Sequence, residues 1–132
     1  MATLPPTIKL ESTDATSDSL SFTVNPNVTV TDPSVGLSKI AATTTGGATI
    51  VVPESTDTRY LYLKHTGKDA SDSAVTTTLN VETANSVPFA KLSAGEWMFV
   101  PVGGASLKIQ LEASASTIIA EYAYWTKVYN IN

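Results

Sequence analysis

The sequence predicts an all-β protein, an antiparallel β-sandwich of jelly-roll-like or immunoglobulin-like type. Apolar and polar residues alternate with a period of two through most of the 132 residues, and no segment shows helical periodicity. Threonine and serine dominate the polar residues, and threonine suits the half-exposed positions of a pleated strand. Glycine and proline turn signals separate the short segments at the spacing typical of a sandwich or barrel.

The first part of the chain contains widely spaced segments. Its predicted strands are Thr7–Glu11, which stands apart, Ser19–Val24 and Asn27–Thr31. Asn25–Pro26 is a turn signal between the last two, and Asp32–Gly36 breaks the chain again. We therefore assign residues 1–35 to an N-terminal arm with peripheral strands, and residues 36–132 to the sandwich core.

From Gly36 onward the predicted strands are dense and regular. They are Leu37–Ala42, Thr49–Val52, Arg59–His65, Val75–Glu82, Val87–Leu92, Glu96–Pro101, Leu107–Glu112 and Thr117–Val128. The breakers between them are Gly46–Gly47, Pro53–Ser55, the polar loop 67–73, Ala94–Gly95 and Gly103–Gly104. Short strands separated by such turn residues are the pattern of a sandwich.

The alternation also predicts which way the side chains point. In Leu107–Glu112 the odd-numbered apolar residues point inward and the even-numbered polar residues, Gln110 among them, point outward. In Val75–Val81 the odd-numbered residues point inward. Thr117–Val128 carries large apolar or aromatic groups on both faces, so this strand is either covered twice or meets a partner on its outer face.

Aromatic residues gather in the predicted strands 59–65, 96–101 and 117–128. One interpretation is that a core covers one face and a loop covers the other. A second is an exposed aromatic patch at a subunit interface, where Tyr and Trp are enriched, and a third is a platform for stacking sugars. The predicted interface residues are Leu4, Pro5, Pro6, Ile8, Tyr60, Tyr62, Trp97, Tyr124 and Trp125.

The composition argues against several classes of partner. The net charge is −4 and Arg59 is the only arginine, so the basic stripe that a nucleic-acid-binding protein needs is missing. With no cysteine, disulfides and thiolate zinc sites are excluded. The N-terminus shows no secretory signal, and the longest apolar runs fall far short of the roughly 20 residues of a membrane-spanning helix. We expect a soluble protein made in the cytosol that binds neither nucleic acid nor membrane.

The sequence offers little catalytic or metal-binding chemistry. The single histidine, His65, ends a strand beside leucines, and we expect it to be structural rather than catalytic. Asp69 and Asp72 are too sparse for a calcium loop. Glu96 is interpreted as a turn residue at a strand start. We therefore predict a non-enzymatic protein without a metal or cofactor.

Four stretches carry a resemblance to a known group of proteins. They are Gly36–Ala42, Arg59–Gly67, Phe89–Pro101 and Ala120–Tyr122. They contain four motifs in a fixed order: a Tyr-hydrophobe-Lys strand followed by His and Thr, a Leu-x-x-Gly-Glu turn, an aromatic strand and a Glu-Tyr pair. Taken together, these motifs resemble those of small β-structured virion proteins of tailed bacteriophages. The resemblance implies a structural subunit of the phage head or tail.

Within that class the expected role is a head decoration or cement protein. It would clamp neighbouring capsid subunits through its N-terminal arm and one aromatic sheet face. Its expected partners are the major capsid protein or other virion subunits, and further copies of itself in a homo-oligomer. The expected location is the virion, assembled in the host cytoplasm, which suits the absence of cysteine. A tail or baseplate subunit is the near alternative, and a carbohydrate-binding module for host adsorption is an alternative from another class.

Overall fold

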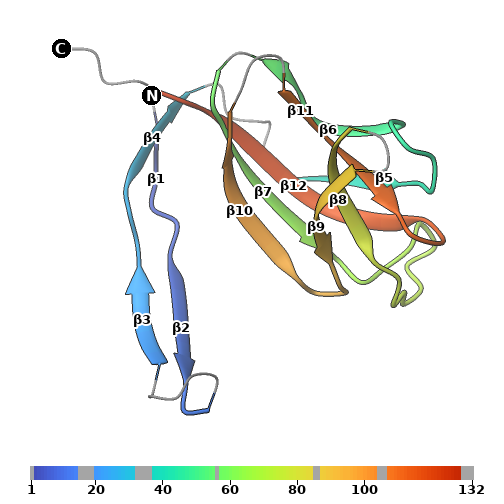
Figure 1. Cartoon of the computed structure of the whole chain (residues 1–132), viewed down its shortest axis with the longest axis horizontal. Helices are drawn as coiled ribbons and strands as arrows, with labels where there is room; N and C mark the ends of the chain where they lie inside the picture. Colours follow the sequence, from blue (N-terminus) through green and yellow to red (C-terminus); the bar gives the residue numbers. More distant parts are fainter. Residues whose placement is uncertain are drawn as a thin grey trace. The chain divides into compact units, whose positions relative to one another are not determined.

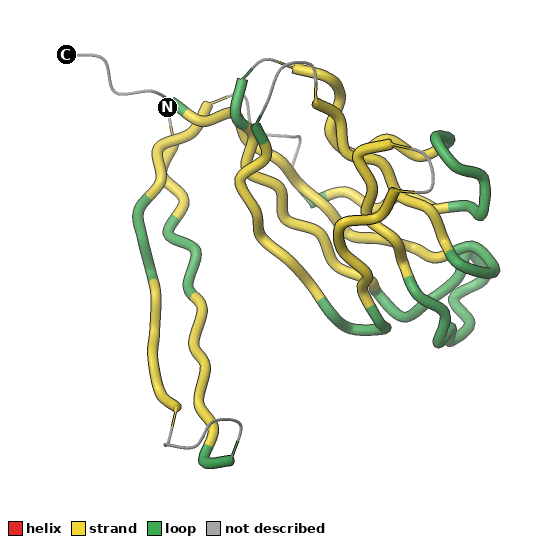
Figure 2. Tube along the Cα trace, in the orientation of Figure 1, coloured by secondary structure: helices red, strands yellow, loops and turns green. Residues whose placement is uncertain are grey.

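The structure is a computed structural model that describes residues 2–14, 20–31, 37–55, 57–84, 87–103 and 107–128. In these residues the secondary structure consists of strands without a helix (Figure 1, Figure 2), which confirms the all-β prediction. No helix long and apolar enough to cross a membrane occurs in the described part of the chain. The strands are β1 (Ala2–Leu4), β2 (Ile8–Ser12), β3 (Leu20–Val24), β4 (Val28–Thr31), β5 (Ser38–Ala42), β6 (Thr49–Ser55), β7 (Arg59–His65), β8 (Leu79–Ala84), β9 (Val87–Leu92), β10 (Trp97–Val102), β11 (Leu107–Ala113) and β12 (Ile118–Lys127).

The chain divides into two compact units. One comprises Met1–Thr31 with Lys127–Asn132, and the other comprises Asp32–Thr126. The arm and core boundary that we predicted between residues 35 and 36 lies outside the described residues.

The larger unit is a β-sandwich with the strand order of a jelly roll. One sheet has the order β5-β12-β7-β10 and the other the order β6-β11-β8-β9. The pairing is nested and antiparallel: β5 pairs with β12, β6 with β11, β7 with β10, and β8 with β9. Two such four-stranded sheets make the eight-stranded jelly roll, whereas an immunoglobulin domain groups its strands differently. Of the two predicted types of sandwich, the topology is the jelly roll.

Alternating side chains from all eight strands of this unit form its core. Leu61 and Leu63 on β7 are fully buried, as are Leu79 and Val81 on β8. The same cluster takes in Ala42, Val51, Val52, Leu92, Val102, Ile109, Leu111, Ala113, Ile118 and Ala120. Burying a leucine or valine side chain contributes roughly 1.5–3 kcal/mol, so this cluster holds the two sheets together.

One side chain expected at the surface is buried. Gln110, expected to point outward, is fully buried, and its Nε2 donates a hydrogen bond of 3.3 Å to Oε1 of buried Glu82. The register of β11 against β6 shifts on either side of Ile109. The extra residues of this irregularity lie on β6, so the alternation of β11 continues. Gln110 lies on the face opposite Ile109 and Leu111, paired with Glu82, and the two polar side chains are buried together. The inward direction of Ile109 and Leu111 is confirmed, while the Leu107 side chain lies outside the described set.

Two predicted strand boundaries also need correction. The strand expected from Val75 begins only at Leu79, because the backbone before it bonds to loops: the Val75 amide donates to the Gly67 carbonyl and the Thr78 amide to Ser114 Oγ. The breaker expected at Pro53 lies inside β6. Since β6 pairs only with β11, it is an edge strand, where a residue without an N–H is tolerated.

The described part of the smaller unit contains a hairpin in two sections. β1, which the sequence pattern missed, pairs with β4, and β2 pairs with β3 (Figure 1). Asn25–Pro26, interpreted as a turn signal between the predicted strands Ser19–Val24 and Asn27–Thr31, lies in the interruption between the two sections, opposite Pro5–Pro6. Proline has no amide hydrogen, so prolines on both strands interrupt the ladder. The end of β12 joins this unit, where the Val128 amide donates to the Thr29 carbonyl.

His65 ties the long loop after β7 to the core. Its Nδ1 accepts a hydrogen bond of 2.9 Å from the Gly67 amide, and its Nε2 lies 2.9 Å from the Thr77 carbonyl oxygen. Because Nδ1 accepts, the proton is on Nε2 and the ring is neutral. The side chain is fully buried, and both nitrogens hold backbone groups, as expected of a structural histidine.

Replacing this histidine should destabilise the larger unit. We expect His65→Ala to lower the free energy of unfolding by about 3 kcal/mol, because it leaves two buried backbone groups without partners and opens a cavity. Thr76→Ala, an exposed change in the same loop, should alter it by less than about 0.5 kcal/mol. Urea unfolding of the two variants measures the difference. Equal stabilities would contradict the assigned role of His65.

Candidate functional site

The outer face of the sheet β5-β12-β7-β10 gathers the aromatic residues. On β7 the buried Leu61 and Leu63 alternate with Tyr60, Tyr62 and Lys64, which therefore point away from the core. The strand register aligns three rows across β10, β7 and β12: Pro101–Tyr60–Trp125, Phe99–Tyr62–Ala123 and Trp97–Lys64–Glu121. We call the residues Tyr60, Tyr62, Trp97, Phe99 and Trp125 the aromatic sheet face.

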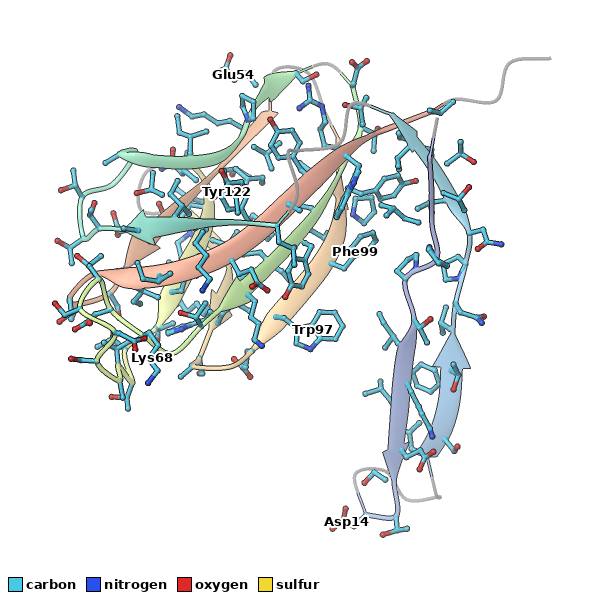
Figure 3. The ribbon with its side chains drawn as sticks, turned by 180° about the vertical axis from the view of Figure 1, so that it is seen from behind. Asp14, Glu54, Lys68, Trp97, Phe99 and Tyr122 are labelled. Atoms are coloured by element: carbon cyan, nitrogen blue, oxygen red, sulfur yellow. The ribbon has the colours of Figure 1, made fainter. Side chains whose placement is uncertain are left out.

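Packing within the aromatic sheet face is ordered. The rings of Tyr60 and Phe99 stack with centroids 5.9 Å apart and planes 9° from parallel. Tyr60 is only 8% exposed, whereas Trp97 is 49% exposed. Trp97 and Phe99 project from the same side of β10 (Figure 3). The face therefore combines a fixed aromatic layer with one large indole open to solvent.

The row that contains Trp97 carries charged residues on the other three strands, and we call it the charged row. Lys64 of β7 is aligned with Glu121 of β12, which in turn is aligned with Lys39 of β5. The Tyr62 hydroxyl donates a hydrogen bond of 2.9 Å to Oε1 of Glu121. Burial of the phenol, this hydrogen bond and the carboxylate charge together raise the pKa of Tyr62 from 10.0 to about 12. The charged row thus connects directly to the aromatic sheet face through Tyr62.

The structure brings four of the predicted interface residues together and separates the others. Tyr60, Tyr62, Trp97 and Trp125 share the aromatic sheet face. Tyr124 lies on the opposite face of β12, against the core, with the Arg59 guanidinium carbon 5.3 Å from its ring centroid.

The remaining predicted residues belong to the smaller unit. Leu4 is half-buried on β1, Pro5 and Pro6 follow it, and Ile8 is exposed at the start of β2. Sequence reasoning omitted Phe99 from the interface. Its position two residues after Trp97, on the same face of the strand, was the signal that could have placed it there.

The acidic residues considered for other roles are engaged in turns. Asp69 Oδ1 accepts hydrogen bonds from the amides of Ser71 and Ser73, at 2.8 and 2.9 Å. Glu96 Oε1 accepts one from the Ser93 amide at 2.6 Å, in agreement with its interpretation as a turn residue. Among the described residues there is no group of three or more His, Cys, Asp or Glu that could hold a metal ion.

No protein-family model matches the chain, and the searches of curated proteins and of solved structures found no match either. The choice of a function therefore depends on the chemistry of the aromatic sheet face. Tyr60 is buried within the chain, whereas Tyr62, Phe99 and Trp125 are half-buried and Trp97 is exposed. These four rings are the stacking surface that the face offers to another molecule.

The raised pKa of Tyr62 predicts a pH dependence of stability. The pKa of Tyr62 in the folded chain lies above the usual value of 10.0. The protonated hydroxyl therefore contributes fully to the free energy of unfolding below pH 10, and this contribution is lost as the pH rises to about 12. Tyr62→Phe should therefore weaken the decline in thermal stability between these pH values. Glu121→Gln should lower the pKa of Tyr62, while Glu54→Gln, an exposed change, should not. Ultraviolet titration of the phenols measures the pKa, and identical titrations of the wild type and Tyr62→Phe at high pH would contradict the assignment.

Proposed function

We propose that this chain is a non-enzymatic structural protein of a tailed-phage virion, a decoration or cement protein of the head. In this role the aromatic sheet face attaches each copy to a neighbouring subunit of the shell. The attachment stabilises the shell by burying surface at many equivalent positions. The partners would be the major capsid protein and other virion subunits, including copies of this chain.

The aromatic sheet face is the observation that carries this proposal. Tyr and Trp are the residues that most often dominate binding energy at protein interfaces. The Tyr60–Phe99 stack and the hydrogen bond from Tyr62 to Glu121 hold three of the rings in place, so these side chains lose little freedom on binding. Trp97, half-exposed beside the stacked Tyr60–Phe99 pair, is suited to insert into a partner's pocket.

The fold and the remaining polar groups are consistent with a structural role. Jelly rolls occur in viral capsid and lectin domains, which supports the proposal by analogy. His65, the single histidine, uses both ring nitrogens on the backbone. Repetition on a lattice also strengthens attachment, because linked copies bind a repeating surface with avidity.

A carbohydrate-binding module is the second candidate, favoured by one observation. Glu121 lies on the same face as the aromatic residues, and sugar-binding sites combine stacking surfaces with polar groups of this kind. In that case glycans of the host surface should change the tryptophan fluorescence of the chain. Trp97→Ala or Trp125→Ala should abolish this response.

The head-binding role predicts saturable co-sedimentation with phage heads that lack the protein. Trp97→Ala should weaken binding about tenfold or more, because it removes the most exposed anchor of the aromatic sheet face. Phe89→Ala is the matched control, since Phe89 is equally exposed, at 50%, but lies on β9 of the other sheet.

Two results would overturn the head-binding role. If heads bind no wild-type protein, the head-binding role is wrong, and the tail or baseplate becomes the proposed location. Co-sedimentation with isolated tails then tests that location. If Trp97→Ala and Phe89→Ala weaken binding to heads equally, the aromatic sheet face is not the attachment surface.

A further inference from the structure

The larger unit contains a pocket between β9 of one sheet and β10 of the other. Its volume is about 190 Å³. Val102 and Ile109 line it, and both are buried members of the hydrophobic core. Phe89 also lines it and is 50% exposed. The pocket therefore extends from the solvent to the core of the sandwich.

The residues that line this pocket are nearly all apolar. Thr83 of β8 is the only one with a polar side chain, and none is charged. A water molecule held inside a protein usually makes two to four hydrogen bonds, which such a lining does not offer to several waters at once. Replacing this water by an apolar group is favourable, because the group also covers the exposed part of the lining. The chemistry of the lining therefore selects an apolar occupant.

The volume of the pocket selects the size of the occupant. Sites for drug-sized ligands measure roughly 300–1,000 Å³, so this pocket is too small for a ligand of several rings. An engineered apolar cavity of about 150 Å³ in another protein binds benzene. A single six-membered ring is therefore the class of ligand that matches both the size and the chemistry of the pocket.

The strand edges beside the pocket argue against an added strand as the occupant. Among the described strands, β9 pairs only with β8 and β10 only with β7, so each is the edge of its sheet. β9 contains Pro88 and β10 contains Pro101. Proline has no amide hydrogen, so neither edge offers a complete ladder to a neighbouring strand. A compact molecule suits the opening better than an extended segment of another protein.

We propose that the pocket between β9 and β10 is a binding site for a small apolar molecule with one ring the size of benzene. This inference goes beyond the proposed function and does not rest on it, since the pocket opens between the two sheets and the aromatic sheet face lies outside them. A bound ring would contact Val100 of one sheet and Ile109 of the other. The exposed ring of Phe89 is available to pack against it.

Titration of the isotope-labelled full chain with benzene, followed by NMR, tests this site. We expect saturable shifts of the amide signals of pocket residues, such as Thr83, Val100 and Val102. Because benzene would bind only the folded chain, it should also raise the melting temperature. Glucose, a polar six-membered ring, is the control ligand and should produce neither effect at the same concentration.

Two substitutions of Val100 test the location and the chemistry of the site. Val100→Phe places a ring in the pocket and should weaken benzene binding at least tenfold. Val75→Phe is the matched control, because Val75 is also a half-buried valine packed against the core but does not line the pocket. It should leave the affinity for benzene unchanged within about twofold. Val100→Thr keeps the shape of the side chain and adds a hydroxyl, so it should weaken binding severalfold without filling the pocket.

Four results would overturn the inference. They are a wild type without saturable shifts, shifts centred on Trp97 instead of the pocket residues, equal effects of Val100→Phe and Val75→Phe, and an unchanged affinity in Val100→Thr. The last comparison decides the matter even if Val100→Phe does not fold. Head binding is measured separately by co-sedimentation, so neither outcome there bears on the pocket.

Discussion

The register of β12 against β7 is the constraint on which the core and the aromatic sheet face both depend. The two strands pair at seven consecutive positions, from Ala120 opposite His65 to Thr126 opposite Arg59. Because side chains alternate with a period of two, this register buries Ala120 and turns Trp125 outward at the same time. A slip by one residue would place the aromatic side chain in the core and the small one in water. The stability of the sandwich therefore also fixes the composition of its outer surface.

Local alternation made much of the fold predictable, and long-range pairing explains what was not. The faces of β7 followed from sequence, since leucines alternate with tyrosines there. The burial of Gln110 did not, because Gln110 is buried together with Glu82, its partner on β8, which lies 28 positions away in the sequence. The hydrogen bond from Tyr62 to Glu121 joins residues 59 positions apart. No local pattern reports which distant strands become neighbours, so the nested order of the jelly roll and the assembly of the aromatic rows were not predictable.

The N-terminal hairpin shows a different limit of sequence reasoning. Pro26 after an asparagine has the same local signature whether the chain turns back or a ladder is interrupted. The registers Leu4 opposite Val28 and Ile8 opposite Val24 leave three residues between the sections on each strand. Prolines lie within this gap on both strands. Their missing amide hydrogens prevent a continuous ladder, while the pairing on either side keeps the two strands together.

In the proposed role the chain has to stay dissolved before it assembles, and the distribution of its charges suits that role. The net charge of −4 makes copies repel weakly at long range, which opposes indiscriminate association. At short range, the charged row beside Tyr62 penalises orientations that bury Lys64 or Glu121 against apolar side chains. In the proposed role, attraction comes from the aromatic sheet face, in contacts that are modest one at a time. Contacts of this strength can dissociate when misplaced and become durable only when a repeating neighbour engages several of them together.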